Sequence, residues 1–202
     1  MIHLEAIMNE YFESLLKTIN DSITNLNEDE FNSLVEDTEN VLKNDRKIIV
    51  TGLGKNVPIC DKFVGTMLSM GMNAAFLHTN TAVHGDLGTV RDGDLVVILS
   101  KSGKTSESVY LLGELKKRNV KIWSITFNPD SPLAKEADAC LLIPMDHEGD
   151  LWDIVPNNST TLYLIVLQAL AITLSKNMGI KLEEFKKNHP GGHIGVQLNG
   201  RA

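Results

Sequence analysis

The stretch Val97-Ile98-Leu99-Ser100-Lys101-Ser102-Gly103-Lys104-Thr105-Ser106-Glu107 passes from an apolar run through small hydroxyl residues into a helical pattern. It predicts a strand, a loop and a helix. A helix N-terminus has unpaired N–H groups and about half a positive charge, so hydroxyl residues placed there favour phosphate binding. The nucleotide P-loop spacing is missing, because no glycine stands five residues before Gly103. The alternative is a helix that is simply capped by Ser102 after a tight turn at Gly103.

Short apolar runs and helical stretches alternate from residue 47 onward. This alternation predicts an α/β fold with a five-stranded parallel, doubly wound sheet in the flavodoxin-like order 2-1-3-4-5, flanked by helices. The five expected strands are residues 48–50, 74–77, 95–99, 122–125 and 139–143. The expected helices are residues 56–70, 105–118, a short turn of helix near 132–137, a buried helix at 159–178 and a last short helix at 182–188. Only a short turn region is expected around residues 82–90.

Two helices are expected ahead of the first strand. Apolar residues recur every three or four positions from Leu4 to Leu26, which predicts an amphipathic helix. Asn27, with Glu30 three residues later, has the spacing of a capping box and predicts the start of a second helix. We expect this N-terminal pair, within residues 1–45, to pack partly on the sheet and partly in an oligomer interface.

Composition restricts the class of protein. A chain of 202 residues is expected to form one domain, 1–202, with a sizeable core. The net charge of −7 argues against a nucleic-acid partner. The excess of acidic residues lies in the N-terminal segment, so the rest of the chain is close to neutral and can bind an anion. Cys60 and Cys140 have no metal-binding spacing and are expected to be inert thiols. We find no signal peptide and no apolar run of membrane-spanning length, so we expect a cytoplasmic protein with no membrane partner.

A ligand site is expected between the first and third strands. In an open α/β sheet, ligands bind beyond the carboxyl ends of the strands, where the strand order reverses. The loops there are Gly52-Leu53-Gly54-Lys55 and Ser100-Lys101-Ser102-Gly103. The first loop matches half of a dinucleotide fingerprint, but Val57 replaces its third glycine. Lys55 at a helix start opposes the helix dipole, which favours a ligand-facing role over a solvated lysine.

Four further residues are candidate catalytic groups, of which Glu107 would orient Lys55 or a substrate hydroxyl rather than transfer the proton. Each also has a simpler explanation. His84 follows the second strand, and an unperturbed imidazole titrates near neutrality. Glu107 lies in a first helical turn, where a carboxylate favours the dipole. Glu148 is in an acidic loop that would ordinarily be solvated, and His189 is at a helix end, which a histidine can cap.

Together these segments resemble the arabinose-5-phosphate isomerases, in the form with a single sugar isomerase (SIS) domain. The resemblance covers about residues 45–200. It rests on Gly-Leu-Gly-Lys at 52–55, His-Gly-Asp-Leu-Gly at 84–88, Ser-Lys-Ser-Gly-Lys-Thr-Ser-Glu at 100–107, Pro-Asn-Asn-Ser-Thr-Thr at 156–161 and His-Pro-Gly-Gly-His-Ile-Gly at 189–195. Asn56-Val57 departs from the usual Ser-Gly, and the tandem CBS domains of many relatives are not found in these 202 residues.

The resemblance implies a homotetramer that interconverts D-ribulose 5-phosphate and D-arabinose 5-phosphate, the first step toward the sugar acid Kdo of lipopolysaccharide or capsule. By position, it implies two sets of site residues. The catalytic set is Lys55, Glu107, Glu148 and His189, with His84 as a further candidate. The phosphate-binding set is Ser100, Ser102, Thr105 and Gly54, to which Ser159 and Thr160 add.

The residue types also suit the chemistry. Aldose-ketose isomerisation moves a proton between neighbouring carbons through an enediol, so it needs a base near pH 7 and a group that stabilises an oxyanion. We expect neither a redox cofactor nor a metal. The base is left open among His189, His84 and a Glu148 of raised pKa, and some groups are allowed to come from a neighbouring subunit.

Two alternatives remain at this stage. One is an isomerase of another phosphosugar, such as a hexulose or heptose phosphate. The other is a non-catalytic sugar-phosphate-binding regulator, which would have no use for Lys55, Glu148 and His189 together.

Overall fold

The computed structural model describes residues 2–199 and the side chains of residues 9–198. Its centre is a parallel sheet of five strands in the order β2-β1-β3-β4-β5, as predicted from the sequence. The strands are β1 (Ile48–Gly52), β2 (Ala74–His78), β3 (Leu95–Leu99), β4 (Lys121–Thr126) and β5 (Ala139–Leu142). Gly52 at the end of β1 pairs with Leu99 at the end of β3, so the loops that follow them begin side by side.

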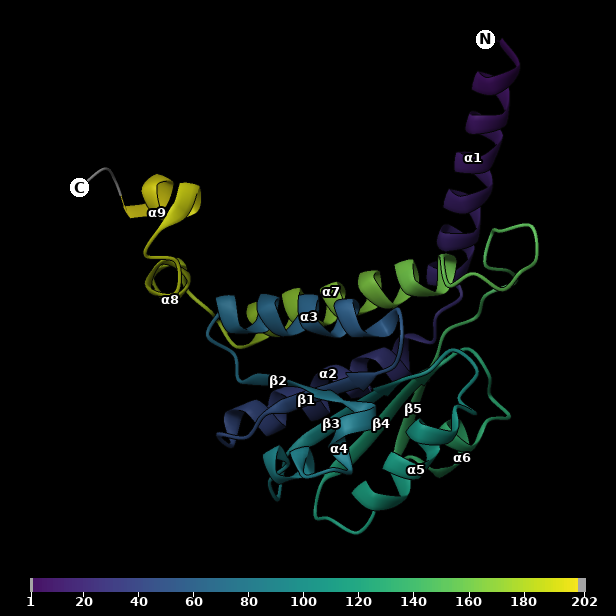
Figure 1. The fold of residues 1–202 in the computed structure, drawn as a ribbon. Coiled ribbons are helices and arrows are strands. Elements are labelled where there is room, and N and C mark those ends of the chain that lie inside the picture. The colour runs from purple at the N-terminus through teal and green to yellow at the C-terminus, as the bar shows by residue number, and fades with distance from the viewer. Residues whose placement is uncertain (1, 200–202) are drawn as a thin grey trace.

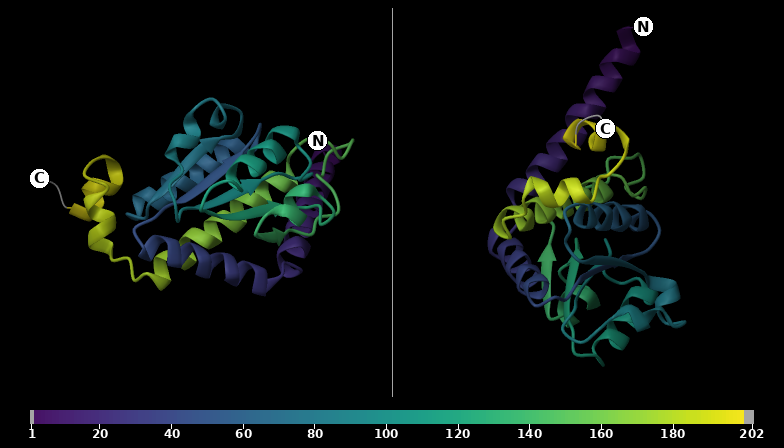
Figure 2. Two further views of the ribbon diagram at one scale, coloured as in Figure 1. Left: turned by 90° about the horizontal axis from the view of Figure 1, so that it is seen from below. Right: turned by 90° about the vertical axis from the view of Figure 1, so that its left-hand side faces the viewer.

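Helices cover both faces of this sheet (Figures 1 and 2). On one face, α2 (Glu28–Lys43), α3 (Asn56–Ser69) and α7 (Asn158–Asn177) pack over alternate strand residues such as Ile48, Val50 and Val97. On the other face, α4 (Thr79–Ala82), α5 (Ser106–Leu115) and α6 (Pro132–Glu136) pack over Ile49 and Val96. Because β1 and β3 are buried on both faces, each is a continuous apolar run that ends at the site.

The two N-terminal helices differ in where they pack. Helix α2 lies against β5, β1 and β3, whereas α1 (Ile2–Thr24) contacts α7 and then projects away from the body (Figure 1). Asn27 caps α2 as predicted, accepting from the N–H groups of Asp29 and Glu30. The Glu30 carboxylate also accepts the backbone N–H of Leu142, 2.9 Å away, so it pairs a polar group of the edge strand β5.

Three helical predictions need correction. Helix α5 ends at Leu115 rather than near residue 118. The region after β2 forms the short helix α4 and the 3-10 helix η1 (Asp86–Thr89), where only a turn was expected. A further helix, α9 (Gly192–Asn199), follows α8 (Leu182–Lys187). Sequence reasoning missed α9 because it begins within a glycine-rich segment, and glycine has low helix propensity.

Helix α7 forms the centre of one helical layer. It contacts α3, α1 and α2, and its inward residues include Leu162, Tyr163 and Leu170. It is long and apolar enough to cross a membrane by length and composition alone, but half of its most apolar window is buried within the protein. Its hydropathy is therefore explained by packing in the core.

The C-terminal helices lie at the opposite end of the molecule from the loops that follow β1 and β3 (Figure 1). The Asn188 side chain donates to the carbonyl of Ser69, which is the last residue of α3. This contact places the start of the His189-Pro190-Gly191-Gly192 segment beside the C-terminal end of α3.

Candidate active site

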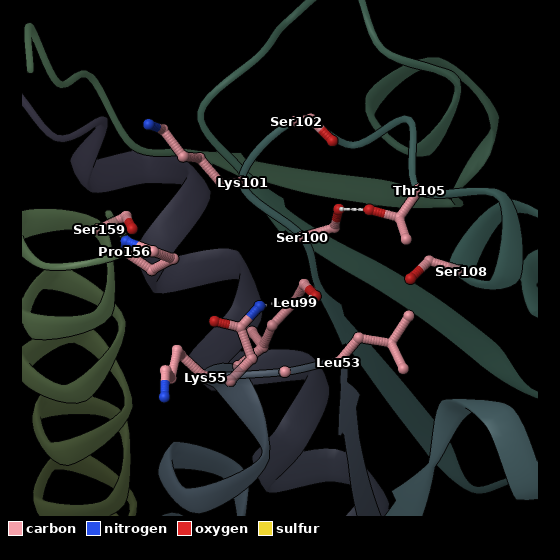
Figure 3. Close-up of a pocket in the computed structure, with 12 residues that line it drawn as sticks. Leu53, Lys55, Leu99, Ser100, Lys101, Ser102, Thr105, Ser108, Pro156 and Ser159 are labelled. Atoms are coloured by element: carbon pink, nitrogen blue, oxygen red, sulfur yellow. Dashed lines mark hydrogen bonds between the residues drawn. The ribbon is translucent and has the colours of Figure 1, made fainter. Parts of the chain in front are cut away.

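A pocket of about 330 Å³ opens where β1 and β3 end, at the position expected from the strand order (Figure 3). Its wall is formed by the loop after β1, the loop after β3 and the start of α7. The lining residues are Leu53, Gly54, Lys55, Asn56, Leu99, Ser100, Lys101, Ser102, Thr105, Ser108, Pro156 and Ser159. Most of these carry a polar side chain, so the pocket suits a polar ligand.

The loop after β1 approaches the end of β3 closely. A Cβ at Gly52 would lie 2.8 Å from the Cβ of Asn56, so only glycine fits there. The Asn56 amide donates to the carbonyl of Leu99, 3.3 Å away, and joins the start of α3 to β3. Gly54 has φ +57°, a left-handed conformation that favours glycine. Lys55 follows at the N-cap of α3, where it is exposed and is one of the residues that line the pocket.

The loop after β3 is held by contacts within it and from the β4–α6 connection. The Ser100 hydroxyl accepts the N–H of Gly103 at 3.2 Å and lies 3.3 Å from the Thr105 hydroxyl. The Asn128 amide donates to the carbonyl of Ser102. A Cβ at Gly103 would lie 2.1 Å from the Ser131 hydroxyl oxygen, so the loop also depends on a glycine. The loop is therefore shaped before any ligand arrives.

The N-cap residue of α5 does not cap the helix with its side chain. Its N-cap is Thr105, which makes no side-chain capping bond, and the Ser102 hydroxyl accepts from Lys104 instead. The simple interpretation of Ser102 as a helix cap is therefore wrong. The positive end of α5 opens beside the hydroxyls of Ser100, Ser102 and Thr105 at the pocket edge.

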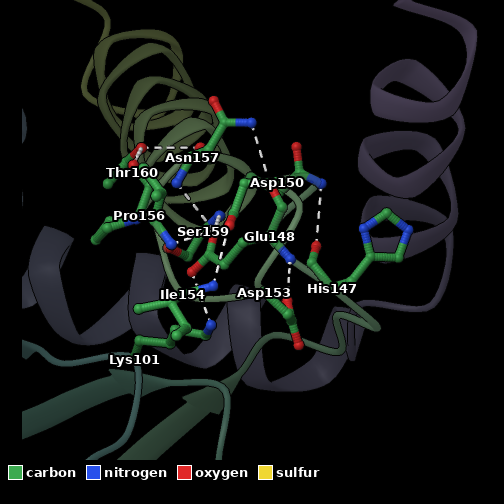
Figure 4. Close-up of polar contacts among 12 residues, drawn as sticks. Lys101, His147, Glu148, Asp150, Asp153, Ile154, Pro156, Asn157, Ser159 and Thr160 are labelled. Carbon is green, nitrogen blue, oxygen red and sulfur yellow. Dashed lines mark hydrogen bonds and ion pairs between the residues drawn. The ribbon is translucent and has the colours of Figure 1, made fainter. Parts of the chain in front are cut away.

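Glu148 lies behind the pocket and is fully buried (Figure 4). One carboxylate oxygen accepts the N–H groups of Asn157 and Ser159, at 3.0 and 2.9 Å, and so caps α7. The other lies 2.8 Å from the ammonium of Lys101. Burial raises the pKa of Glu148, but Lys101 and the bonds from Ser159 and Asn157 outweigh it and leave the pKa below its ordinary value. The raised pKa that a carboxylate base would need is absent, and Glu148 remains ionised.

Ser159, but not Thr160, lines the pocket. Thr160 donates its hydroxyl to the carbonyl of Asn157, 2.8 Å away, within the first turn of α7. Glu107 is exposed in the first turn of α5, and its pKa is lowered by its own backbone N–H and by the Ser106 hydroxyl. It lies outside the set of residues that line the pocket.

Neither candidate histidine lines the pocket of its own chain. His84 is exposed after α4, where its N–H donates to the carbonyl of Thr81. His189 stacks on Phe185, and its Nδ1 lies 2.8 Å from the carbonyl of that residue. His189 follows the residue that contacts the C-terminal end of α3, whereas Lys55 precedes the N-terminal end. The 14 residues of α3 separate the two by about 20 Å.

The predicted site residues did not include three polar lining residues, Asn56, Lys101 and Ser108. Lys101 was available as a cation inside the expected phosphate loop. Ser108 was detectable as a polar residue on the buried side of α5, where Leu111, Leu112 and Leu115 follow at helical spacing. No group of three or more metal-ligating side chains is found among the described residues.

The fold and the pocket define a parallel α/β domain with a largely polar pocket beyond the carboxyl ends of β1 and β3. The profile of the SIS domain matches residues 41–173, so the chain belongs to the SIS domain family.

Curated relatives include arabinose 5-phosphate isomerases named KdsD. The chain is 37% identical over 158 residues to KdsD of Pseudomonas aeruginosa, covering 78% of this chain and 48% of that protein. It is 38% identical over 152 residues to KdsD of Escherichia coli K12, covering 75% and 46%. The chain thus spans about half the length of these relatives. A solved Escherichia coli CFT073 protein, in complex with arabinose 5-phosphate, is 32% identical with a TM-score of 0.85, covering 94% of this chain and 98% of that one.

Proposed function

We propose that the chain is an aldose-ketose isomerase that interconverts D-arabinose 5-phosphate and D-ribulose 5-phosphate through an enediol. The proposal rests on one pocket that is lined by a cation from the loop after β1 and by hydroxyls from the loop after β3. The Lys55 ammonium lies on one side, and the hydroxyls of Ser100, Ser102 and Thr105 lie on the other at the open end of α5 (Figure 3). The relatives named for arabinose 5-phosphate and the solved complex with that sugar phosphate support this substrate.

In this proposal the phosphate is the inert anchor. Gly54 and the three hydroxyls surround it, with Ser159 at the far wall, and the positive end of α5 stabilises its charge. This orientation directs the sugar carbonyl toward Lys55. The ammonium then stabilises the negative charge that develops on oxygen when the neighbouring carbon loses its proton.

The proton is transferred by a histidine in this account. Glu148 has both carboxylate oxygens engaged and a lowered pKa, so we assign it the positioning of α7 and Lys101. Glu107, exposed beside the loop, orients Lys55 or a substrate hydroxyl. His189 and His84 remain the candidate bases, since imidazole titrates near neutral pH.

His189 reaches a pocket only from another copy of the chain. The length of α3 separates it from Lys55 within one chain. We therefore propose an oligomer, a homotetramer by resemblance, in which the C-terminal segment of one subunit completes the pocket of its neighbour. The projecting α1 and its exposed Tyr11, Phe12 and Leu16 support a role for the N-terminal helices in that interface.

We place this activity in the cytoplasm, where it supplies the synthesis of Kdo for lipopolysaccharide or capsule. A panel of pentose, hexose and heptose 5-, 6- and 7-phosphates tests the substrate. The expected result is ketose formation with D-arabinose 5-phosphate at a kcat/KM well above that of every other sugar. Equal or greater turnover of a hexose or heptose phosphate would replace the proposed substrate, and binding without any turnover would favour the regulator.

A further inference from the structure

Ser108 carries a buried hydroxyl that the fold does not use. It is the third residue of α5 and is 1% exposed. The hydroxyl oxygen makes no hydrogen bond with any part of the chain that the structure describes. An unpaired buried hydroxyl loses its hydrogen bonds to water on folding and so destabilises the folded state.

The position itself calls for an apolar side chain. Leu111, Leu112 and Leu115 continue the same face of α5 into the core, and all three are buried. An alanine at 108 would fill the same space without a polar atom. A residue that breaks the local packing rule in this way is expected where function requires it.

The Ser108 side chain is part of the pocket wall. In Figure 3 its hydroxyl points toward the interior between Thr105 and Leu53. Thr105 stands three residues before Ser108, so the two lie on the same side of α5, one turn apart. The Thr105 and Ser100 hydroxyls lie together at the N-terminal end of α5.

We infer that the Ser108 hydroxyl joins the hydroxyls of Ser100, Ser102 and Thr105 in anchoring the phosphate and donates a hydrogen bond to a phosphate oxygen of the bound sugar phosphate. The oxygens of a dianionic phosphate can only accept hydrogen bonds. The Ser108 O–H can donate one, and no acceptor in the described part of the protein uses it. The inference rests on the proposed function only in taking a phosphorylated ligand. It requires neither the identity of the sugar nor turnover.

The test is ligand binding to Ser108→Ala. D-arabinitol 5-phosphate has no carbonyl and cannot be isomerised, so calorimetry reports its binding alone. Loss of one hydrogen bond is expected to weaken its binding roughly 5- to 10-fold, and binding of inorganic phosphate is expected to weaken in parallel. The unfolding temperature of the ligand-free variant is expected to equal or exceed that of the wild type.

A matched control is Ser124→Ala. Ser124 is also fully buried, but it lies on β4 and outside the pocket lining. Its substitution is expected to leave the dissociation constants unchanged.

The outcomes separate the two proposals. An unchanged dissociation constant in Ser108→Ala overturns the inference, as does a lower unfolding temperature without ligand, which would show a structural role. If the wild type binds the phosphorylated polyol but isomerises no sugar phosphate, the proposed function fails. Weaker binding of the polyol by Ser108→Ala would then still support Ser108 as a donor to the phosphate. If the wild type binds neither the polyol phosphate nor inorganic phosphate, both fail.

Discussion

The ammonium of Lys101 lies 2.8 Å from the buried carboxylate of Glu148, and the same carboxylate caps α7 through the N–H groups of Asn157 and Ser159. This pair joins the loop after β3 to α7, the helix that forms the far wall of the pocket. It has one fully buried partner and one that is partly exposed. The loop after β3 and α7 are therefore held together by a charge pair whose disruption is measurable.

Lys101→Met is expected to destabilise the protein by roughly 1–3 kcal/mol at pH 7, because it leaves the buried Glu148 carboxylate with fewer partners. The folded pKa of Glu148 is lowered, so its stabilising contribution is present above the ordinary pKa of 4.5 and is lost as the pH falls through the folded value. Urea unfolding at several pH values should show the difference between variant and wild type shrinking below pH 4.5.

The matched control is Lys104→Met in the same loop, where the lysine is exposed. It is expected to change stability by less than about 0.5 kcal/mol. A Lys101 variant as stable as this control would contradict the importance of the pair.

Lys55→Ala is expected to reduce kcat/KM by at least about 100-fold while leaving the unfolding temperature unchanged, because Lys55 is exposed and supplies oxyanion stabilisation rather than packing. Steady-state kinetics and thermal unfolding of the same preparation measure both. Lys62→Ala, on the helix that Lys55 precedes, is the control and should retain activity. Wild-type-like turnover in Lys55→Ala would remove Lys55 from the mechanism.

His189→Ala is expected to be inactive alone but to regain activity when it is unfolded and refolded together with Lys55→Ala. If each pocket takes Lys55 from one subunit and His189 from another, random mixing leaves about a quarter of the pockets intact. The activity of the refolded mixture, against each variant refolded alone, measures this. No recovery despite mixed oligomers would place both residues in one chain or exclude His189.

Gly103→Ala is expected to destabilise the protein by roughly 2–4 kcal/mol and to weaken phosphate binding, because the new Cβ would lie 2.1 Å from the Ser131 hydroxyl at a φ of +61°. Gly113→Ala on α5 is the opposite case, since its Cβ would meet no atom within 4 Å. It is expected to stabilise the protein by about 0.5–1 kcal/mol. Denaturant unfolding that ranked the two variants the other way would contradict the described loop packing.

The sheet and the site location followed from the sequence because both depend on local patterns. Apolar runs such as 95–99 identify buried strands, and the loops at Gly52 and Ser100 follow from where those runs stop. The role of Glu148 was not predictable in the same way. Its capping of α7 and its pairing with Lys101 depend on segments that only the folded chain brings together.

The separation of Lys55 from His189 is a second property that sequence order conceals. Both residues belong to motifs of the same resemblance, yet the contact between Asn188 and Ser69 places His189 beyond the far end of α3. Motif matching shows which residue types are present. It does not show which of them share a pocket within one chain.

The most direct test of the account follows the C2 proton of D-arabinose 5-phosphate by NMR in heavy water with the purified protein. We expect loss of the C2 proton signal at a rate proportional to protein concentration, together with the appearance of D-ribulose 5-phosphate and with no added cofactor. The same sample with Lys55→Ala should keep the signal. A full C2 proton signal with wild-type protein that binds the sugar phosphate would contradict the isomerase.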